Sequence, residues 1–178
     1  NFTTISERLR PHQVVALLNT YLSRACEVIL EQGGTVDKFI GDSIMAVFGS
    51  PVPHRDHALN AICAALGMIE TAREFRSWMD QRFAGKDLPA FAIGIGLHTG
   101  EAVIGSIGSP KRMEFTAIGD TVNLASRLEN LTKDLGWPIV ASSATIQAVG
   151  PSVVTGRRER VAVKGREEYV EVFEVIGL

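Results

Sequence analysis

The sequence contains little cysteine, no clear excess of either charge and no long apolar run. Its 178 residues include two cysteines and carry a net charge of −2. This balance gives no basic surface for nucleic acid and no block of like charge for a membrane surface. We therefore expect no nucleic-acid partner and no membrane contact by this domain itself.

The apolar and thiol side chains exclude further classes of protein. The longest apolar run, around Ala58 to Ile69, is interrupted by Asn60 and is too short to span a bilayer. Cys26 and Cys63 each lie in an apolar helical pattern, which favours buried free thiols over a disulfide or a metal pair. Free thiols are typical of a reducing compartment, so the sequence predicts a cytoplasmic location.

The stretch DKFIGDSIMAVFG, from Asp37 to Gly49, predicts a β-hairpin with polar side chains near its turn. The runs that flank Gly41 and Asp42 are rich in β-branched and aromatic residues, and this pair is a usual two-residue connection. Asp42 could offer oxygen ligands to magnesium, and Lys38 could donate to a polar ring or a phosphate. From these residues alone, two solvated hairpin ends explain the pattern about as well.

A second stretch, FTAIGDTVNLASRLE from Phe115 to Glu129, predicts a strand that leads into a helix with Asp120 as its N-cap. Asn123 and Arg127 are four residues apart, so they share one face of that helix. Helix N-termini attract phosphate, and an arginine fork matches phosphate oxygens. An exposed polar face with a capping aspartate is an equally good explanation of this stretch taken alone.

The rest of the chain alternates between helical and strand patterns without a linker, a repeat or a low-complexity segment. The predicted helices cover residues 11–32, 54–82, 120 onward and 142–149. Besides the hairpin, the predicted strands cover residues 91–99 and 101–107, joined at Gly100, and residues 113–118, 138–141, 161–164 and 169–176. At this length we expect one domain with a substantial core.

Taken together and in this order, the two motifs resemble the class III nucleotide cyclase catalytic domain, the family of adenylyl and guanylyl cyclases. The resemblance extends over the whole chain through ordered blocks of sequence: NFTTISERL, GGTVDKFIGDSIMAVFG, DHALNAICAAL, IGIGLHTGEAVIGSIG, FTAIGDTVNLASRLE and VAVKG. It implies an α+β fold with a ferredoxin-like βαββαβ core, in which helices pack on an antiparallel-rich sheet. Residues 1–178 would form a single catalytic domain.

The resemblance also implies roles for the purine-binding and metal-binding residues. Lys38 is similar to the purine-selecting lysine, where guanylyl cyclases tend to have glutamate. Thr116 stands at the other purine-contacting position, where its hydroxyl can accept from the exocyclic amine of adenine. The pair therefore favours ATP over GTP, and it resembles a subgroup that responds to bicarbonate. Asp42 is similar to the second of two aspartates that hold two Mg²⁺ or Mn²⁺ ions.

Three further residues are assigned to the ribose and the phosphates by the same resemblance. Asn123 is similar to the residue that orients the ribose, and Arg127 to the one that meets charge on the α-phosphate. Lys164 is similar to the residue that contacts the triphosphate. The first metal aspartate of the family opens a DIxxFT motif, and the chain begins inside that motif. We expect this aspartate, and the first core strand, upstream of Asn1.

These implied roles predict an adenylyl cyclase that converts ATP to 3′,5′-cyclic AMP and pyrophosphate in intracellular signalling. Class III domains pair head to tail, so we expect a homodimer with active sites at the interface. The domain could be the cytoplasmic part of a larger, membrane-attached sensor. The alternatives are a guanylyl cyclase, which Lys38 disfavours, and an inert pseudo-cyclase that dimerises or senses nucleotide.

Overall fold

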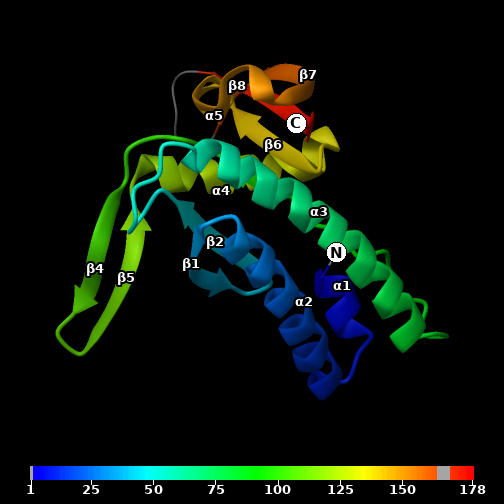
Figure 1. The fold of residues 1–178 in the computed structure, drawn as a ribbon. Helices are drawn as coiled ribbons and strands as arrows, with labels where there is room; N and C mark the ends of the chain where they lie inside the picture. The colour runs from blue at the N-terminus through cyan, green and yellow to red at the C-terminus, as the bar shows by residue number, and fades with distance from the viewer. Residues whose placement is uncertain (1, 164–168) are drawn as a thin grey trace.

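The computed structural model describes residues 2–163 and 169–178 (Figure 1). Long amphipathic helices and short strands alternate along the chain, as the hydrophobic periodicities predict. The α-helices are α1 (Phe2–Glu7), α2 (Pro11–Glu31), α3 (His57–Arg82), α4 (Asp120–Leu135) and α5 (Ser143–Val149), followed by a 3₁₀ turn, η1 (Gly150–Ser152).

The strands form three separate ladders. They are β1 (Gly34–Ile40), β2 (Ser43–Phe48), β3 (Ile95–Leu97), β4 (Val103–Ser109), β5 (Arg112–Ile118), β6 (Ile139–Ser142), β7 (Val154–Val161) and β8 (Val170–Gly177). β1 and β2 form one antiparallel hairpin, and β4 and β5 form another. The remaining four strands make a sheet of order β3-β6-β8-β7, in which only the β3–β6 pair is parallel. The mixed, antiparallel-rich α+β architecture is thus confirmed.

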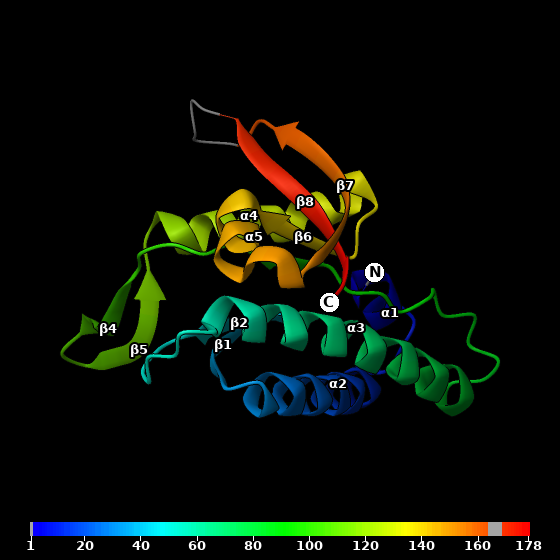
Figure 2. The same cartoon turned by 45° about the horizontal axis from the view of Figure 1, so that its top comes forward.

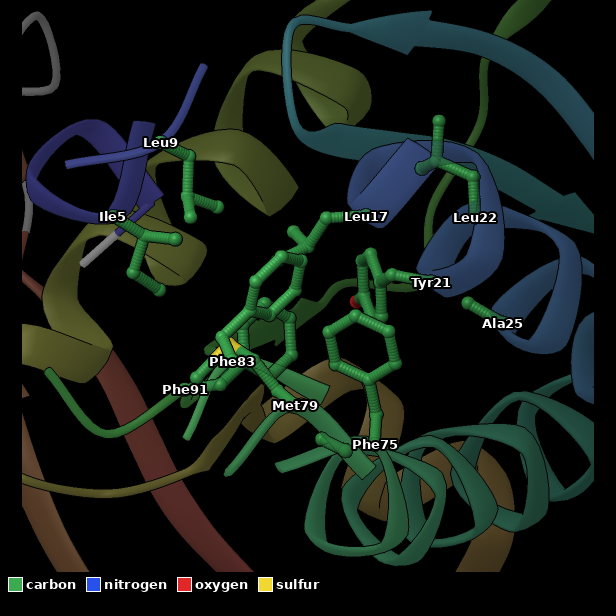
Figure 3. Packing of buried hydrophobic residues seen from close by; sticks show 11 residues of the cluster. Ile5, Leu9, Leu17, Tyr21, Leu22, Ala25, Phe75, Met79, Phe83 and Phe91 are labelled. Atoms are coloured by element: carbon green, nitrogen blue, oxygen red, sulfur yellow. The ribbon is translucent and has the colours of Figure 1, made fainter. Parts of the chain in front are cut away.

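The largest apolar cluster joins α1, α2 and α3 (Figure 3). Tyr21 of α2 packs edge-on against Phe91, with ring centroids 4.9 Å apart, and Phe75 of α3 packs edge-on against the same ring at 4.8 Å. Aromatic pairs of this geometry stabilise a core by about 0.5–1.5 kcal/mol beyond their buried area. The cluster holds the two long helices side by side (Figure 2) and so fixes the base from which the β1–β2 hairpin emerges.

The four-stranded sheet is covered by α4 on one face and by α3 on the other. Val140 of β6 packs with Leu124 and Leu128 of α4, whereas its neighbours in β6 pack with Ile62 of α3. At Gly96 in β3, an added Cβ would lie 2.3 Å from both the Ala125 carbonyl oxygen and the Glu129 amide nitrogen of α4. Gly96 therefore permits close packing of β3 against α4.

The β4–β5 hairpin projects from the body of the molecule (Figures 1 and 2). Seven residue pairs align along it, from Val103 opposite Ile118 to Ser109 opposite Arg112. Its strands form no ladder with the main sheet. We call this hairpin the arm. Its exposed apolar side chains are Val103, Met113, Phe115 and Ile118.

Several element predictions need correction. The predicted strand at 91–99 is reduced to β3 and pairs with β6, not with the strand after Gly100, because β4 turns away into the arm. In place of the predicted strand at 161–164, the chain forms β7, which ends at Val161. Cys26 and Cys63 are free but half-buried rather than buried. In the part of the chain that is described, no helix combines the length and apolar character that crossing a bilayer demands.

Candidate active site

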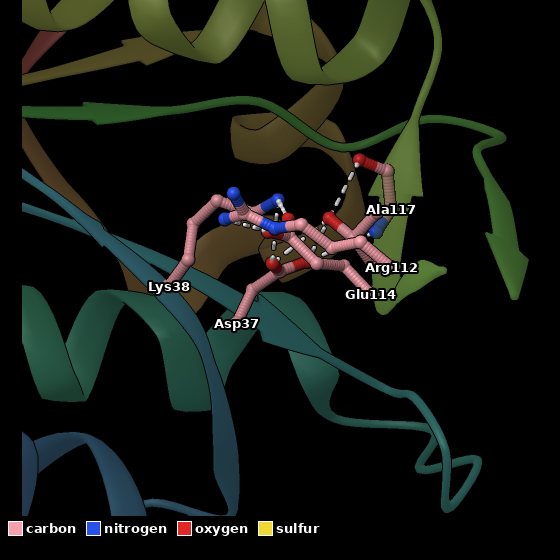
Figure 4. A network of polar contacts seen from close by, with 6 residues as sticks. Asp37, Lys38, Arg112, Glu114 and Ala117 are labelled. Atoms are coloured by element: carbon pink, nitrogen blue, oxygen red, sulfur yellow. Dashed lines mark hydrogen bonds and ion pairs between the residues drawn. The ribbon is translucent and has the colours of Figure 1, made fainter. Parts of the chain in front are cut away.

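Asp37, Lys38 and Glu114 form a polar cluster between β1 and the arm (Figure 4). Lys38 and Thr116, 78 positions apart in the chain, both contact this cluster. The Lys38 Nζ atom donates to Glu114 Oε2 over 2.7 Å and lies 3.8 Å from Asp37 Oδ1. The Thr116 Oγ1 atom donates to the same Asp37 carboxylate at 2.8 Å. The two residues expected to contact a purine are therefore joined through one carboxylate.

Asp37 is the centre of this cluster and is almost completely buried, with 5% of its side chain exposed. It lies at a β-bulge, where the register of β1 against β2 shifts between Val36 and Lys38. A bulge bends the strand and redirects its side chains. Here it allows the consecutive residues Asp37 and Lys38 to reach the same cluster, although side chains normally alternate across a strand.

The partners on the arm follow from ordinary strand geometry. Glu114 and Thr116 are two residues apart on β5 and therefore point to one face of it. The backbone amide of Ala117 adds a hydrogen bond to Asp37 Oδ2 at 2.9 Å. A small cavity of about 90 Å³, lined mainly by apolar atoms, lies between β1 and β5 and borders both Asp37 and Thr116.

Electrostatics favour the charged forms of both ends of the Lys38–Glu114 pair. The hydrogen bond to Glu114 raises the pKa of Lys38, and the nearby Asp37 charge adds to this effect. The same hydrogen bond, followed by one from Arg112 at 3.0 Å, lowers the pKa of Glu114. Lys38 is therefore a positively charged donor at neutral pH, the form needed to contact a ring nitrogen.

Asn123 and Arg127 lie on α4, which directly follows the arm. The helix begins at Asp120, but its N-cap is Gly119 with φ 136°, a conformation that favours glycine. The prediction of Asp120 as the N-cap is therefore wrong by one residue. Asn123 is exposed, whereas Arg127 is half-buried.

Arg127 carries a buried donor that has no acceptor. Its Nη1 atom is inaccessible to solvent and is the one such unpaired side-chain atom among the described residues. Leaving a buried donor unpaired costs about 1–3 kcal/mol, and charged groups cost more. An unpaired buried donor calls for an explanation. Because Nη1 is closed to solvent, only the accessible part of the half-buried guanidinium can meet an anionic ligand.

Asp42 is exposed in the turn after β1, next to Gly41 with φ 64°. Its charge acts on the α2 side of the hairpin, since burial first and Asp42 second raise the pKa of Tyr21. The described residues include no group of three His, Cys, Asp or Glu side chains able to hold a metal ion. Asp42 is thus one accessible oxygen ligand, of the kind that magnesium prefers.

The structure brings together part of the predicted set. Lys38 and Thr116 share one cluster, Asn123 and Arg127 share one helix, and Asp42 lies at the tip of the β1–β2 hairpin. Lys164 lies outside the described residues.

Sequence reasoning missed Asp37 and Glu114. A signal for Glu114 was its two-residue spacing from Thr116 in a strand. No local signal marks the bulge that turns Asp37 into the cluster.

The protein is thus a mixed α+β domain in which Lys38 and Thr116 contact one buried carboxylate and Arg127 lies on the helix that follows the arm. Residues 1–176 match the family described as the adenylate and guanylate cyclase catalytic domain. The chain therefore belongs to this family.

Related sequences and structures agree with this membership. Adenylate cyclase 1 of Rhizobium meliloti is 40% identical over 178 residues, which are 100% of this chain and 26% of that protein. The adenylyl cyclase CyaB from P. aeruginosa superposes with a TM-score of 0.90 at 32% identity, covering 99% of this chain and 89% of that one. The guanylyl cyclase Cya2 gives 0.89 at 35% identity, covering 99% and 87%.

The comparisons bear on the length of the protein and on its choice of nucleotide. The chain spans about a quarter of the length of the Rhizobium relative. Solved structures named for adenylyl and for guanylyl cyclases resemble it almost equally. The choice of nucleotide is therefore a question for the side chains of this chain, not for overall similarity.

Proposed function

We propose that this chain is the catalytic domain of an adenylyl cyclase, which converts ATP to 3′,5′-cyclic AMP and pyrophosphate. The observation that carries the proposal is the junction of Lys38 and Thr116 at the Asp37 carboxylate. It sets a charged donor beside a hydroxyl oxygen, the pair needed to read one edge of a purine. Relatives named adenylate cyclase, at 36–40% identity over nearly the whole chain, support it.

The purine edge decides between the two nucleotides. Adenine presents an acceptor at N1 and a donor at its exocyclic amine, and guanine presents the reverse, an N1–H donor and an O6 acceptor. The Lys38 ammonium only donates and so matches adenine N1. Thr116 Oγ1 accepts from the amine. The proposed substrate is therefore ATP.

The phosphate chemistry is assigned to α4. The ribose 3′-hydroxyl loses its proton to water as its oxygen attacks the α-phosphorus and a new P–O bond forms. The bond between the α-phosphorus and the oxygen that bridges to the β-phosphorus breaks in line, and pyrophosphate leaves with that oxygen. Arg127, half-buried on α4, neutralises charge on the α-phosphoryl oxygens in the transition state. Asn123 orients the ribose, and Lys164 contacts the triphosphate.

Asp42 is assigned as a metal ligand. Catalytic domains of this family in general depend on divalent metal ions. When bound, two Mg²⁺ or Mn²⁺ ions lower the pKa of the attacking hydroxyl and brace the triphosphate. The exposed carboxylate of Asp42 would hold one position in that site.

A second copy of the chain is the proposed partner. The arm exposes Met113 by 55% and Phe115 by 59%, and these residues are two positions apart on β5 and therefore lie on one face of it. Apolar side chains gathered on a projecting hairpin mark an interaction surface. A symmetric dimer buries this surface twice and places Asp42 of one copy opposite the purine pair of the other.

The test is cyclic nucleotide production by the full protein with ATP or GTP, in magnesium or manganese, over a range of protein concentrations. We expect cyclic AMP from ATP, with specific activity rising as concentration increases. Cyclic GMP formed from GTP in preference to cyclic AMP from ATP would establish a guanylyl cyclase instead. No product from either nucleotide, with dimerisation intact, would establish a pseudo-cyclase.

A further inference from the structure

Asp37 has no role in the proposed chemistry, yet it is the most buried carboxylate of the cluster and the most fully used. Its oxygens accept from Thr116 Oγ1 at 2.8 Å and from the Ala117 amide at 2.9 Å, and Lys38 Nζ lies 3.8 Å away. The amide and the ammonium only donate, so both require an acceptor at this position. A buried carboxylate with three donors around it is held in place.

The contact between Asp37 and Thr116 determines which way the hydroxyl hydrogen of Thr116 points. A threonine hydroxyl has one hydrogen and two lone pairs, and the hydrogen rotates to the best acceptor nearby. Asp37 offers both oxygens at 2.8 Å, whereas the alternative acceptor, the Ala117 carbonyl, lies 3.5 Å away. The Thr116 hydroxyl therefore donates its hydrogen to Asp37. On the side away from Asp37, the Thr116 oxygen presents only lone pairs.

We propose that Asp37 is a positioning residue that sets base specificity, because it fixes the Thr116 hydroxyl as an acceptor and so selects adenine over guanine. This inference rests on the proposed function. A free threonine hydroxyl would read either base, since it could rotate to donate to guanine O6. With Asp37 in place, guanine O6 would face a lone pair of Thr116 Oγ1. Two acceptors would then oppose each other without a hydrogen between them, and neither would gain a hydrogen bond.

The β-bulge is what makes this arrangement possible. Without the extra residue in β1, Asp37 and Lys38 would point to opposite faces of the hairpin. With it, the same short segment supplies the donor for N1 and the group that orients the acceptor for the amine. The bulge thus places both halves of base recognition on consecutive residues, as bulges beside functional sites do elsewhere.

The first experiment compares Asp37→Asn with the unchanged protein by measuring kcat/KM for ATP and for GTP. The asparagine amide can donate to Thr116 while its oxygen accepts from Ala117, which frees the hydroxyl to donate. Sites built to match hydrogen-bonding groups discriminate by factors of about 10⁴–10⁵. We expect the ATP-to-GTP ratio to fall by about tenfold or more. Asp80→Asn, an exposed aspartate on α3, is the matched control and should leave the ratio unchanged.

A merely structural role for Asp37 would reduce activity with both nucleotides equally and leave their ratio unchanged, which would overturn the inference. Because Asp37→Asn could disturb folding, Thr116→Val and Thr116→Ser provide an independent test with Asp37 intact. The serine variant keeps the hydroxyl and should keep the ratio, whereas valine should lower it. A valine variant with the original ratio would also overturn the inference.

The double variant shows whether Asp37 acts through Thr116. In the Thr116→Val background, Asp37→Asn should change the ratio no further, because no hydroxyl remains to be oriented. An additional, independent fall would mean that Asp37 acts through Lys38, contrary to the inference. If the unchanged protein makes cyclic AMP but these ratios do not move, only the inference fails. If it makes no cyclic nucleotide, the proposed function fails and the inference fails with it.

Discussion

At the scale of single residues, Arg127 offers the clearest separation of function from stability. Its buried Nη1 has no acceptor, so the folded protein bears a cost for keeping it. Residues that serve chemistry at the expense of stability are characteristic of active sites. Asp37 shows the opposite case, a buried charge whose hydrogen bonds are made within the protein.

Arg127→Ala should therefore lower kcat by about 100-fold or more while changing KM for ATP little, since the guanidinium acts mainly in the transition state. The thermal midpoint should stay the same or rise, because an unsatisfied buried donor is removed. Steady-state kinetics and a thermal melt measure both effects. Arg73→Ala, at an exposed arginine that pairs with Glu70 on the surface of α3, is the control. A raised KM with unchanged kcat would contradict the assignment.

At the scale of secondary-structure elements, the close contact between β3 and α4 is the most sensitive point. Gly96→Ala would place a Cβ 2.3 Å from two backbone atoms of α4, which the helix can relieve only by moving. We expect a loss of at least about 2 kcal/mol in the free energy of unfolding, measured with urea. Gly105→Ala on the arm is the matched control, because its added Cβ would meet no atom within 4 Å. Equal losses in the two variants would refute this reading of the packing.

The β7–β8 hairpin contains a second ion pair with a clear pH signature. Arg157 Nε and Nη2 donate to the two oxygens of Glu174 at 2.9 and 3.0 Å, and this contact lowers the pKa of Glu174. A carboxylate with a lowered pKa stabilises the fold above its unfolded pKa of about 4.3 and loses this effect as pH falls.

Glu174→Gln should therefore lower the urea midpoint slightly at pH 7, and the difference from the unchanged protein should shrink steadily below about pH 4. Urea titrations at a series of pH values measure it. A difference that stays constant down to pH 2.5 would show that the ion pair contributes nothing and that the loss comes from packing alone.

The elements themselves were largely predictable, because α2, the β1–β2 hairpin and the start of α4 carry strong local periodicity and turn residues. Strand pairing was not. The parallel contact of β3 with β6 joins residues more than 40 positions apart, and nothing near Gly100 indicates that β4 leaves the sheet. The site followed the same division. Lys38, Thr116, Asn123 and Arg127 stand in motifs, whereas the role of Asp37 depends on a bulge and on a contact across 79 positions.

At the scale of the whole molecule, the arm should control assembly. Met113→Glu puts a charge on an exposed apolar side chain of the arm, at 55% exposure, and leaves the core of the monomer untouched. We expect weaker dimerisation and a specific activity that falls about tenfold or more on dilution. Sedimentation velocity and activity at matched concentrations measure both. Val154→Glu on β7, exposed by 48%, is the control. A fully active monomer would refute the dimeric site.

The hydrogen bonds between Asp37 and the arm also bear on how the arm is held. The arm forms no ladder with the main sheet, and Asp37 ties its base to β1 through Thr116 and Ala117. The hydrogen bonds to which we assign base selection thus also connect the arm to β1. On the proposed assignment, a substitution at Asp37 should therefore alter subunit pairing as well as nucleotide preference.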